Sequence, residues 1–429
     1  MPKVIILVSL LAFGSVPVAR PATWYVDSSL PESGDGTSWQ TAFTRIQEGV
    51  EAASDGDTVV AAEGAYFGVH FKGKNISLLS TNPHDPRVVA ATIMDGYAVR
   101  FSGVEDQTCV LSGFTIRGAT GRGVGGGVYG AGTRATISHN VITGNFALFS
   151  GGGVAECHGL IENNVITGNS AGNPLRHGLG GGLYRCNAVI RNNVIAGNRA
   201  LSASEYVPGG PQWVEGEGGG LYDCQGTIVN NTIFGNLGLP GGLYGCHGDI
   251  RNNIIWGNLM PWGTPGWQLA DSMDPAYSCV EGWTGGGWGN IAEDPLFVDA
   301  ENGNFRLTPC SPCIDKGDSW AVYLPDTDIA GIPRIMGFYF LAPDMGAYEV
   351  VLAKLERGPG GGRVELTWAW WPGATWTVLY SDDLLTWRVA DDNAPFRPLD
   401  TISWIDDGSK TGTPPWLVPR RFYRVLQNP

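Results

Sequence analysis

Four tyrosines stand at matching places in the middle of the chain, each two residues after a run of glycines. They are Tyr129, Tyr184, Tyr222 and Tyr244. If each occupies one coil of a repeated β-structure, their rings form a ladder with a spacing of about 4.8 Å, which suits contact with successive sugar rings. The alternative is that the rings only cover a β-surface and brace longer segments beside it.

Charged residues next to this ladder are candidates for catalysis. Glu156 and Asp223 offer carboxylates, and Arg185 offers a guanidinium group. A glycoside hydrolase needs two or three carboxylates close together, one as the acid and one as the base or nucleophile. A lyase needs calcium or another positioned cation together with an arginine or lysine base. His158 and His247 each stand alone after an aligned cysteine, which is more typical of a turn residue than of a base.

Three aspartates near the end of the repeat region are candidate ligands for a cation. Asp326 and Asp328 form an Asp-x-Asp pair, and Asp344 lies in a later loop. Carboxylate oxygens are ligands that Ca²⁺ prefers in proteins. Calcium is therefore the cofactor that these residues would fit.

The elements that position these side chains follow an internal repeat, approximately Asn-[Val/Thr/Ile]-Ile-x-Gly-Asn. Its five copies are Asn140–Asn145, Asn164–Asn169, Asn193–Asn198, Asn231–Asn236 and Asn253–Asn258. Self-similarity of this kind indicates a solenoid. The shortest unit has the length of three short strands with their turns. A leucine-rich horseshoe would need a leucine pattern that is missing here, and separate hairpins would leave the in-register copies unexplained.

Alternation within each unit predicts which side chains face the core. Two isoleucines per unit, such as Ile161 and Ile166, are expected to point inward, together with the first Asn of each Asn pair. The second Asn suits a left-handed backbone conformation, which Asn tolerates better than most residues. The inward amides would then hydrogen-bond from coil to coil in one stack. That stack consists of Asn163, Asn192, Asn230 and Asn252.

Extra length in the longer units falls at one place, between the Gly-Asn of one copy and the next glycine run. The two insertions are Ser170–Leu179 and Arg199–Glu217. In a solenoid, insertions at one turn project from one side, which is often the binding side. The second insertion adds Tyr206 and Trp213 to the candidate substrate-binding residues, and it carries the further carboxylates of Glu205, Glu215 and Glu217.

These features predict an all-β fold, a right-handed parallel β-helix built as a single-stranded solenoid. A helix near its start is expected to cap the open end of the core. Phe43, Ile46 and Val50 lie at helical spacing, with Thr41 or Thr44 available as the cap residue.

Four of the eight cysteines sit at one equivalent position in successive repeats. They are Cys157, Cys186, Cys224 and Cys246. Their spacing matches no zinc motif, and we expect an internal ladder of buried thiols rather than bridges between neighbouring coils. Cys310 and Cys313 form a Cys-x-x-Cys without a surrounding βαβ pattern, so a local structural bridge is expected there rather than a redox motif.

The first 22 residues predict export. Lys3 precedes an apolar run, Val4 to Val18, that is too short for a membrane span and is followed by small residues. A secreted or cell-surface protein without a transmembrane segment after signal removal is therefore expected. A net charge of −14 argues against a nucleic-acid partner.

Three segments follow from these patterns: a signal peptide over residues 1–22, the β-helix over 23–352 and a small β-sandwich over 353–429. The last segment begins after a glycine-rich linker at Gly358–Gly362, and its aromatic and aliphatic residues alternate as in short strands.

The repeat units also resemble a known family. Gly-Gly-Gly-Leu-Tyr followed by Asn-Asn-x-Ile-x-Gly-Asn is similar to repeats of polymorphic outer-membrane proteins and of secreted bacterial proteins with the pectate-lyase-like fold. Trp24–Asp27 resembles the start of that fold, and Asn290–Asp299, Ser311–Asp315 and Asp344–Glu349 resemble its closing segment. The tail at Ser381–Trp387 and Arg421–Val425 resembles fibronectin-III-like modules. The resemblance implies the fold and says little about activity.

The function expected from the sequence is carbohydrate binding or surface attachment, with an extracellular polysaccharide or a cell-surface glycan as the partner and without demonstrable catalysis. The first alternative is a polysaccharide lyase or glycoside hydrolase that acts on an anionic polysaccharide. The sequence lacks the paired aspartates, Gly-His-Gly and Arg-x-Lys of polygalacturonases, and the Arg-x-Pro-x-x-Arg of pectate lyases. The second alternative is a structural surface component.

Overall fold

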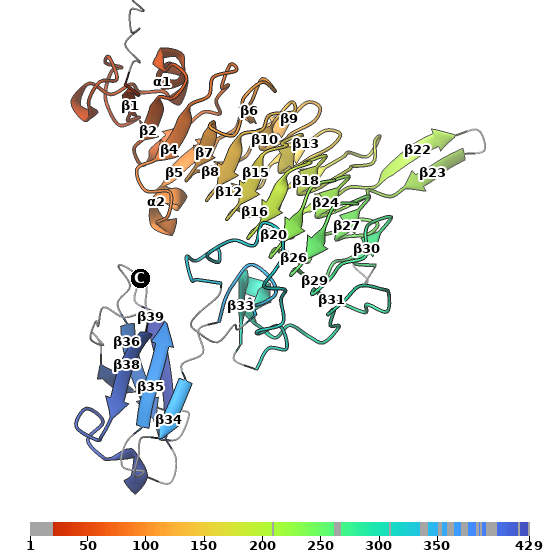
Figure 1. Cartoon of the computed structure of the whole chain (residues 1–429). Helices are drawn as coiled ribbons and strands as arrows, with labels where there is room; N and C mark the ends of the chain where they lie inside the picture. The colour runs from red at the N-terminus through yellow and green to blue at the C-terminus, as the bar shows by residue number, and fades with distance from the viewer. Residues whose placement is uncertain are drawn as a thin grey trace, which may run out of the picture.

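The chain folds into a parallel β-helix followed by two small antiparallel sheets (Figure 1). This computed structural model describes residues 20–207, 210–260, 267–308, 310–334, 342–350, 354–357, 364–369, 376–382, 386, 388–391, 401–418 and 421–427. Four parallel sheets, named A to D here, run along the β-helix. The all-β fold and the parallel solenoid predicted from the sequence are confirmed.

Sheets A and B form the two longer walls, with nine strands each. Sheet A contains β1 (Thr23–Val26), β2 (Thr58–Ala61), β4 (Ser77–Ser80), β7 (Val110–Ser112), β11 (Thr136–Ser138), β15 (Leu160–Glu162), β19 (Val189–Arg191), β25 (Ile228–Val229) and β28 (Ile250–Arg251). Sheet B contains β3 (Gly64–Tyr66), β5 (Thr92–Asp95), β8 (Thr115–Arg117), β12 (Val141–Thr143), β16 (Val165–Thr167), β20 (Val194–Ala196), β26 (Thr232–Phe234), β29 (Ile254–Trp256) and β31 (Cys279–Val280).

Sheet C is the third wall and has seven strands. They are β6 (Val99–Arg100), β10 (Val128–Tyr129), β14 (Val154–Ala155), β18 (Leu183–Tyr184), β24 (Leu221–Tyr222), β27 (Leu243–Tyr244) and β30 (Leu269–Ala270). A short sheet D, which the sequence did not predict, lies between sheets B and C along the chain. It contains β9 (Thr120–Gly121), β13 (Phe146–Ala147), β17 (Ser170–Ala171) and β21 (Arg199–Ala200).

The isoleucine columns face the core as predicted, since each is paired in register with its equivalent in the next coil. Ile166, for example, lies opposite Ile195, and both are fully buried. The assignment within the Asn pairs was wrong. The first Asn takes the left-handed conformation, with a φ of 55° at Asn163, and the second Asn, Asn164, is the one buried in the core. The left-handed residue is the corner of the coil, so it interrupts the alternation and restarts it one residue later.

The second Asn of each pair builds a continuous hydrogen-bonded ladder. The backbone N–H of Asn164 donates to Oδ1 of Asn193 at 3.0 Å, and Asn164 Nδ2 donates to the carbonyl of Ile137 at 2.8 Å. A parallel ladder is formed by the last Asn of each copy, as in the bond from Asn169 N to Asn198 Oδ1 at 3.0 Å. These bonds satisfy polar groups that would be costly to bury alone.

Glycine runs occur where sheet D turns into sheet C because neighbouring backbones come too close for a Cβ atom. A Cβ on Gly181 would lie 2.5 Å from the backbone of Arg199 and 2.6 Å from the carbonyl of Gly219 in the next coil. The equivalent glycines of other coils meet the same obstacle. The high glycine content is therefore a packing requirement at this corner.

The aligned cysteines lie inside the β-helix as the predicted ladder of thiols. All four are fully buried, and each thiol contacts the next along the stack. The bend between sheet C and sheet A explains how both the Leu and the Cys of Leu-Tyr-x-Cys point inward. Arg185, between Tyr184 and Cys186, has a φ of 48° and turns the chain there.

The first end of the core is capped as predicted. Helix α1 (Ile46–Ala52) places Ile46 and Val50 in the main core, and Gly49 allows it to approach Val59 of β2. The cap residue is Arg45 rather than either predicted threonine, because the Glu48 side chain accepts from the backbone N–H of Arg45. A second helix, α2 (Pro86–Ala91), and three 3-10 turns, Trp39–Thr41, Ala300–Asn302 and Pro415–Leu417, complete the helical elements of the described chain.

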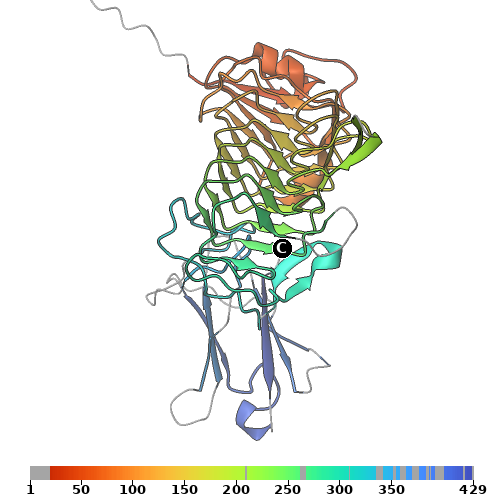
Figure 2. The ribbon, with the colours of Figure 1, turned by 90° about the vertical axis from the view of Figure 1, so that its right-hand side faces the viewer.

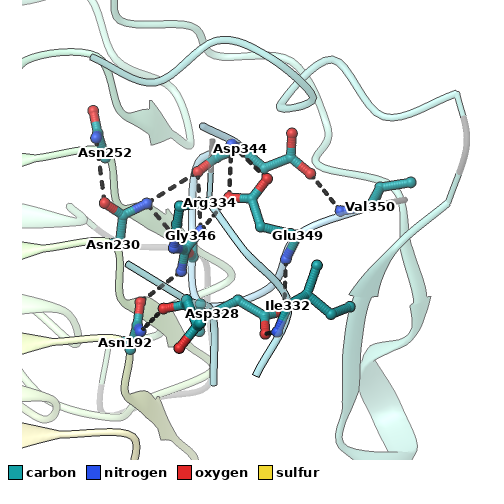
Figure 3. A network of polar contacts seen from close by, with 12 residues as sticks. Asn192, Asn230, Asn252, Asp328, Ile332, Arg334, Asp344, Gly346, Glu349 and Val350 are labelled. Atoms are coloured by element: carbon teal, nitrogen blue, oxygen red, sulfur yellow. Dashed lines mark hydrogen bonds and ion pairs between the residues drawn. The ribbon is translucent and has the colours of Figure 1, made fainter. Parts of the chain in front are cut away.

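The other end is closed by residues 311–334 and 342–350, together called the closing segment here, which fold back along the left-handed Asn column (Figure 3). The hairpin of β32 (Phe297–Asp299) and β33 (Asn304–Leu307) precedes it. Asn230 Nδ2 donates to the carbonyl of Asp344 at 3.0 Å, and Gly346 N donates to the carbonyl of Asn252 at 2.8 Å. This segment buries Asn192, Asn230 and Asn252, although their side chains point away from the core of the β-helix.

A buried ion pair lies at the centre of this contact. Arg334 donates to Glu349 at 2.6 Å, and both side chains are almost fully buried. The same guanidinium donates to Asn192 Oδ1 at 2.6 Å and to the carbonyl of Gly346 at 2.9 Å. Breaking such a pair leaves an uncompensated charge, so the network couples the closing segment to the coils.

The C-terminal residues form two three-stranded antiparallel sheets, drawn in blue (Figures 1 and 2). One contains β34 (Lys354–Arg357), β35 (Val364–Ala369) and β38 (Thr401–Asp406), and the other β37 (Arg388–Asp391), β36 (Trp376–Ser381) and β39 (Phe422–Gln427). Leu366, Val378 and Trp404 are buried. The strands predicted for this region are present, whereas the boundary at residues 352 and 353 lies outside the described residues.

The predicted signal peptide also falls largely outside the described residues, which begin at residue 20. Within the described chain, neither helix has the length and apolar character needed to cross a bilayer.

Candidate functional site

The outer face of sheet C carries one continuous column of side chains along the β-helix. Parallel pairing aligns the second residue of every strand, while the first residue of each, such as Val154 or Leu183, is buried in the core. The outward column reads His70, Arg100, Tyr129, Ala155, Tyr184, Tyr222, Tyr244 and Ala270. All four predicted tyrosines therefore share one column, in which Tyr129, Tyr222 and Tyr244 are partly exposed and Tyr184 and Ala155 are buried.

A second column of polar side chains follows at the bend after sheet C. Its members are the left-handed residues that come directly after the outward position. They are Glu156, Arg185, Asp223 and Asp271, with φ values between 44° and 53°, whereas Gly245 takes the equivalent place after Tyr244 with a φ of 66°. The three predicted catalytic candidates thus stand beside the tyrosines, one per coil. The sequence signal for this arrangement was the spacing of Leu-Tyr-x-Cys.

The tyrosine rings stack on one another. The ring centroids of Tyr184 and Tyr222 are 5.7 Å apart with an interplanar angle of 17°, and those of Tyr222 and Tyr244 are 5.4 Å apart at 7°. Both faces of the Tyr222 ring are therefore occupied by protein. A sugar ring can contact the edges and hydroxyl groups of this ladder, but it cannot stack on Tyr222 in the way that the sequence suggested.

Tyr129 is separated from the other three rings by Ala155, and it has different partners. The guanidinium of Arg100 lies 5.6 Å from the centre of its ring. Burial raises the pKa of Tyr129, and the hydrogen-bonded carboxyl of Glu156 raises it further. Within the described chain, Arg100 forms no ion pair with a carboxylate, so its charge is available to a ligand.

Arg185 and Asp223 bond to each other across neighbouring coils. Arg185 Nε lies 2.9 Å from Asp223 Oδ2, and its guanidinium carbon lies 5.1 Å from the centre of the Tyr184 ring. The pair is largely solvent-exposed, so its contribution to stability is small. Two charged groups held beside a row of phenols offer hydrogen-bond donors and acceptors on the same face.

Glu217, from the end of the second insertion, joins the same face. Leu179 and Glu217 pair in a parallel bridge immediately before the glycine runs of their coils. Burial raises the pKa of Glu217, and the nearby His177 opposes that shift. The charge of Glu217 is in turn the main cause that raises the pKa of Tyr244, and with burial it raises the pKa of Tyr222 to about 12. The carboxyl is therefore close to both phenols.

Both insertions begin with a strand of sheet D, β17 or β21, and end before a strand of sheet C. The second one forms a hairpin of β22 (Ala203–Val207) and β23 (Gly210–Val214) that extends from the β-helix (Figure 1). Tyr206 and Trp213 lie on these strands. Their side chains are outside the described part of the structure, so their role in binding stays a prediction.

The three aspartates proposed for calcium have separate surroundings. Asp328 accepts from the backbone N–H groups of Ile332 and Glu349, and Asp344 from those of Asp315 and Val350, whereas Asp326 is exposed. Among the described residues, no three His, Cys, Asp or Glu side chains are placed to hold a metal ion. Asp328 and Asp344 thus organise the backbone of the closing segment.

His158 and His247, the two isolated histidines, lie outside the column, whereas His177 lies near it and Arg100 belongs to it. His158 accepts from the backbone N–H of Asn187 and His247 is exposed, as expected for turn residues. Sequence reasoning did not single out His177 or Arg100. His177 lies inside the first predicted insertion. Arg100 precedes the recognisable repeats, so no glycine run marks its strand in the sequence.

Comparisons with known proteins assign this chain to no family. No protein-family profile matches the chain, and no curated protein sequence does. Among solved structures, it is similar to that of pectate lyase Pel9A, with 14% sequence identity and a TM-score of 0.39. The alignment covers 78% of this chain and 97% of the other. At this level the likeness says nothing about activity, and the parallel β-helix is defined by the sheets described above.

Proposed function

We propose that this protein is exported and binds a polysaccharide along the outer face of sheet C. The observation that carries the proposal is the continuous outward column with its flanking row of charged residues. Tyr222 and Tyr244 repeat the same group on neighbouring coils at a spacing of about 4.8 Å, which suits a long ligand with its own repeat. Many weak contacts of this kind add up for a ligand that spans several coils.

The chemistry of the column favours a hydroxyl-rich ligand. The hydroxyls of Tyr222 and Tyr244 can donate and accept hydrogen bonds, and the Arg185–Asp223 pair offers both donors and acceptors. The unpaired charge of Arg100 at one end adds attraction for an acidic sugar. Because the rings stack on one another, polar contacts and ring edges contribute more than face-to-face stacking.

Affinity electrophoresis of the mature chain in gels containing neutral and acidic polysaccharides, with and without calcium, tests this proposal. We expect retardation by at least one polysaccharide, and its loss or weakening in Tyr222→Ala and Arg185→Ala. Arg87→Ala, which changes an exposed ion pair on α2, is the matched control. Retardation that is equal in all variants would place the ligand elsewhere. No retardation by any polysaccharide would instead favour a structural surface component.

A second candidate function, cleavage of the bound polysaccharide, is favoured by one observation. Glu217 is a carboxyl whose pKa is raised by burial beside the tyrosine column, and this is the property of a general acid. Asp223 supplies a second carboxylate on the same face, as a hydrolase would need. This face thus contains a candidate acid, Glu217, and a candidate base, Asp223.

Product analysis distinguishes binding from cleavage. Incubation with the retained polysaccharide should release reducing ends for a hydrolase, or unsaturated sugars that absorb in the ultraviolet for a lyase. Glu217→Gln should abolish the products while keeping the retardation in the gel. If wild-type protein is retarded and releases no product, the protein binds without cleaving, and the first proposal stands by itself.

A further inference from the structure

Cys279 and Cys313 bring two distant parts of the chain together at the end of the core. Cys279 begins β31, the last strand of sheet B, and Cys313 lies in a turn of the closing segment. Both are fully buried in one small apolar cluster with Ile254, Leu307 and Met345. The two thiols are close enough within this cluster that Cys313 is the main cause raising the pKa of Cys279, and Cys279 Sγ donates to the carbonyl of Glu293 at 3.2 Å.

The position of Cys310 is different from that of Cys313. Cys310 is exposed, whereas Cys313 is directed into the cluster and contacts Cys279. A local bridge within Cys-x-x-Cys, as the sequence suggested, would require the buried Cys313 side chain to leave this cluster. The arrangement therefore selects Cys279 as the partner of Cys313.

We propose that Cys279 and Cys313 form a disulfide in the exported protein and lock the closing segment onto the last coil. The two thiols lose their protons and two electrons, and one S–S bond forms between them. A disulfide oxidant, such as oxidised glutathione or a dithiol oxidase of the export compartment, takes up the electrons and is reduced to two thiols.

We do not expect disulfides within the thiol ladder inside the β-helix, for a geometric reason. Cys186 and Cys224 lie on neighbouring coils in register, so their Cα–Cβ bonds are parallel and about 4.8 Å apart. A disulfide has a shorter typical Cβ separation, about 3.8 Å, and needs the two side chains to approach each other. Cys279 and Cys313 come from a strand and a turn, which are free of this restriction.

The bridge acts on the contacts that close the β-helix. The backbone N–H of Met345 donates to the carbonyl of Cys313, and Met345 lies next to Asp344 and Gly346, which contact the Asn column. A covalent link at Cys313 therefore holds Cys313, and through this hydrogen bond Met345, near the last coil. Its reduction should loosen the closing segment before the coils themselves unfold.

Peptide mapping tests the proposal. The full chain is produced by export, or produced reduced and treated with oxidised glutathione, and free thiols are alkylated before digestion without reductant. We expect one linked peptide pair containing Cys279 and Cys313, 2 mass units lighter than the two thiol peptides because two hydrogen atoms are lost. Cys310 and the ladder cysteines should be alkylated. Alkylated Cys279 and Cys313, or a linked Cys310–Cys313 peptide, would overturn the proposal.

Thermal unfolding with and without reductant provides a second readout that does not depend on mapping. Reductant should lower the apparent Tm of wild-type protein by roughly 5 °C or more. Cys279→Ser and Cys313→Ser should start at lower values and lose their response to reductant. Cys310→Ser is the matched control and should keep the full response. A wild-type Tm that does not change with reductant would contradict the bridge. If reductant lowers the Tm of Cys279→Ser as much as that of wild-type protein, the effect comes from other cysteines.

Discussion

Arg334 donates to Oδ1 of Asn192 at 2.6 Å, although 142 residues separate them along the chain. Asn192 is the left-handed corner of its coil, and Arg334 belongs to the segment that closes the other end of the β-helix. One guanidinium therefore connects a corner of the solenoid to the buried carboxylate of Glu349 (Figure 3). This relationship explains why the closing segment lies along the Asn column.

Replacing Arg334 by Met is expected to lower the free energy of unfolding by about 3–5 kcal/mol, because Glu349 would remain buried without its partner. Urea unfolding followed by circular dichroism measures the change. The double variant Arg334→Met/Glu349→Gln should recover part of it, since the buried charge is then removed. Arg87→Ala, at an exposed pair, should change stability by less than about 1 kcal/mol. Equal losses of stability in Arg334→Met and Arg87→Ala would contradict a stabilising role for the buried ion pair.

Asp344, next to the Arg334–Glu349 ion pair, makes stability depend on pH. Burial raises the pKa of its carboxyl to about 6. The folded chain therefore keeps a proton on Asp344 at pH values where the unfolded chain has already lost it. The stabilisation is complete below the unfolded pKa, near 4, and is lost as the pH rises through about 6.

The free energy of unfolding should accordingly fall by about 2 kcal/mol between pH 4.5 and pH 6.5. Urea titrations at these two values provide the measurement. Asp344→Asn should reduce this pH dependence, although its own stability is lower because an amide cannot accept both backbone N–H groups. A wild-type stability that increases over this interval would show that the hydrogen bonds to Asp344 outweigh its burial.

The two members of each Asn pair should respond differently to substitution. Asn164→Ala leaves the backbone N–H of Asn140 and the carbonyl of Ile137 without partners in the core, with an expected loss of about 3 kcal/mol. Asn163→Gly keeps the left-handed corner accessible and should cost less than about 1 kcal/mol. Chemical denaturation of both variants checks the order. The reverse order would support the inward position first assigned to Asn163.

The glycine runs are expected to tolerate no side chain. Gly181→Ala would place a methyl group 2.5 Å from the backbone of Arg199, and we expect a loss of about 3 kcal/mol or a failure to fold. Gly144→Ala is the control, since that glycine has a φ of 63° but open space around its Cβ position. It should cost only about 1 kcal/mol, from backbone strain. A mild effect at Gly181 would mean that neighbouring coils can move apart.

The repeat made most of the β-helix predictable, because the isoleucine and cysteine columns depend only on alternation within a coil and on stacking between coils. The Asn assignment failed where alternation is interrupted, at the left-handed corner of Asn163. The closing network could not be predicted, since the contact of Arg334 with Asn192 depends on the path of a long non-repetitive segment. The same holds for Cys313, whose nearest cysteine in sequence is not its neighbour in space.

The candidate site was predictable as a column and not in its detail. The spacing of Leu-Tyr-x-Cys placed Tyr184, Tyr222 and Tyr244 on one face with Arg185 and Asp223 beside them. It could not show that the rings stack on one another, because ring orientation depends on side-chain torsions that a sequence pattern does not contain. Glu217 gains its importance from burial by surrounding coils, which is also a property of the folded chain.

Oxidative footprinting of tyrosines, with and without the polysaccharide that retards the protein, tests directly whether a polysaccharide binds along sheet C. Mass spectrometry measures the modification of each tyrosine in the intact mature chain. We predict that the ligand protects Tyr129, Tyr222 and Tyr244, while Tyr323, which is 55% exposed on the closing segment, is modified as before. Protection of Tyr323 with unchanged modification of the sheet C tyrosines would contradict it.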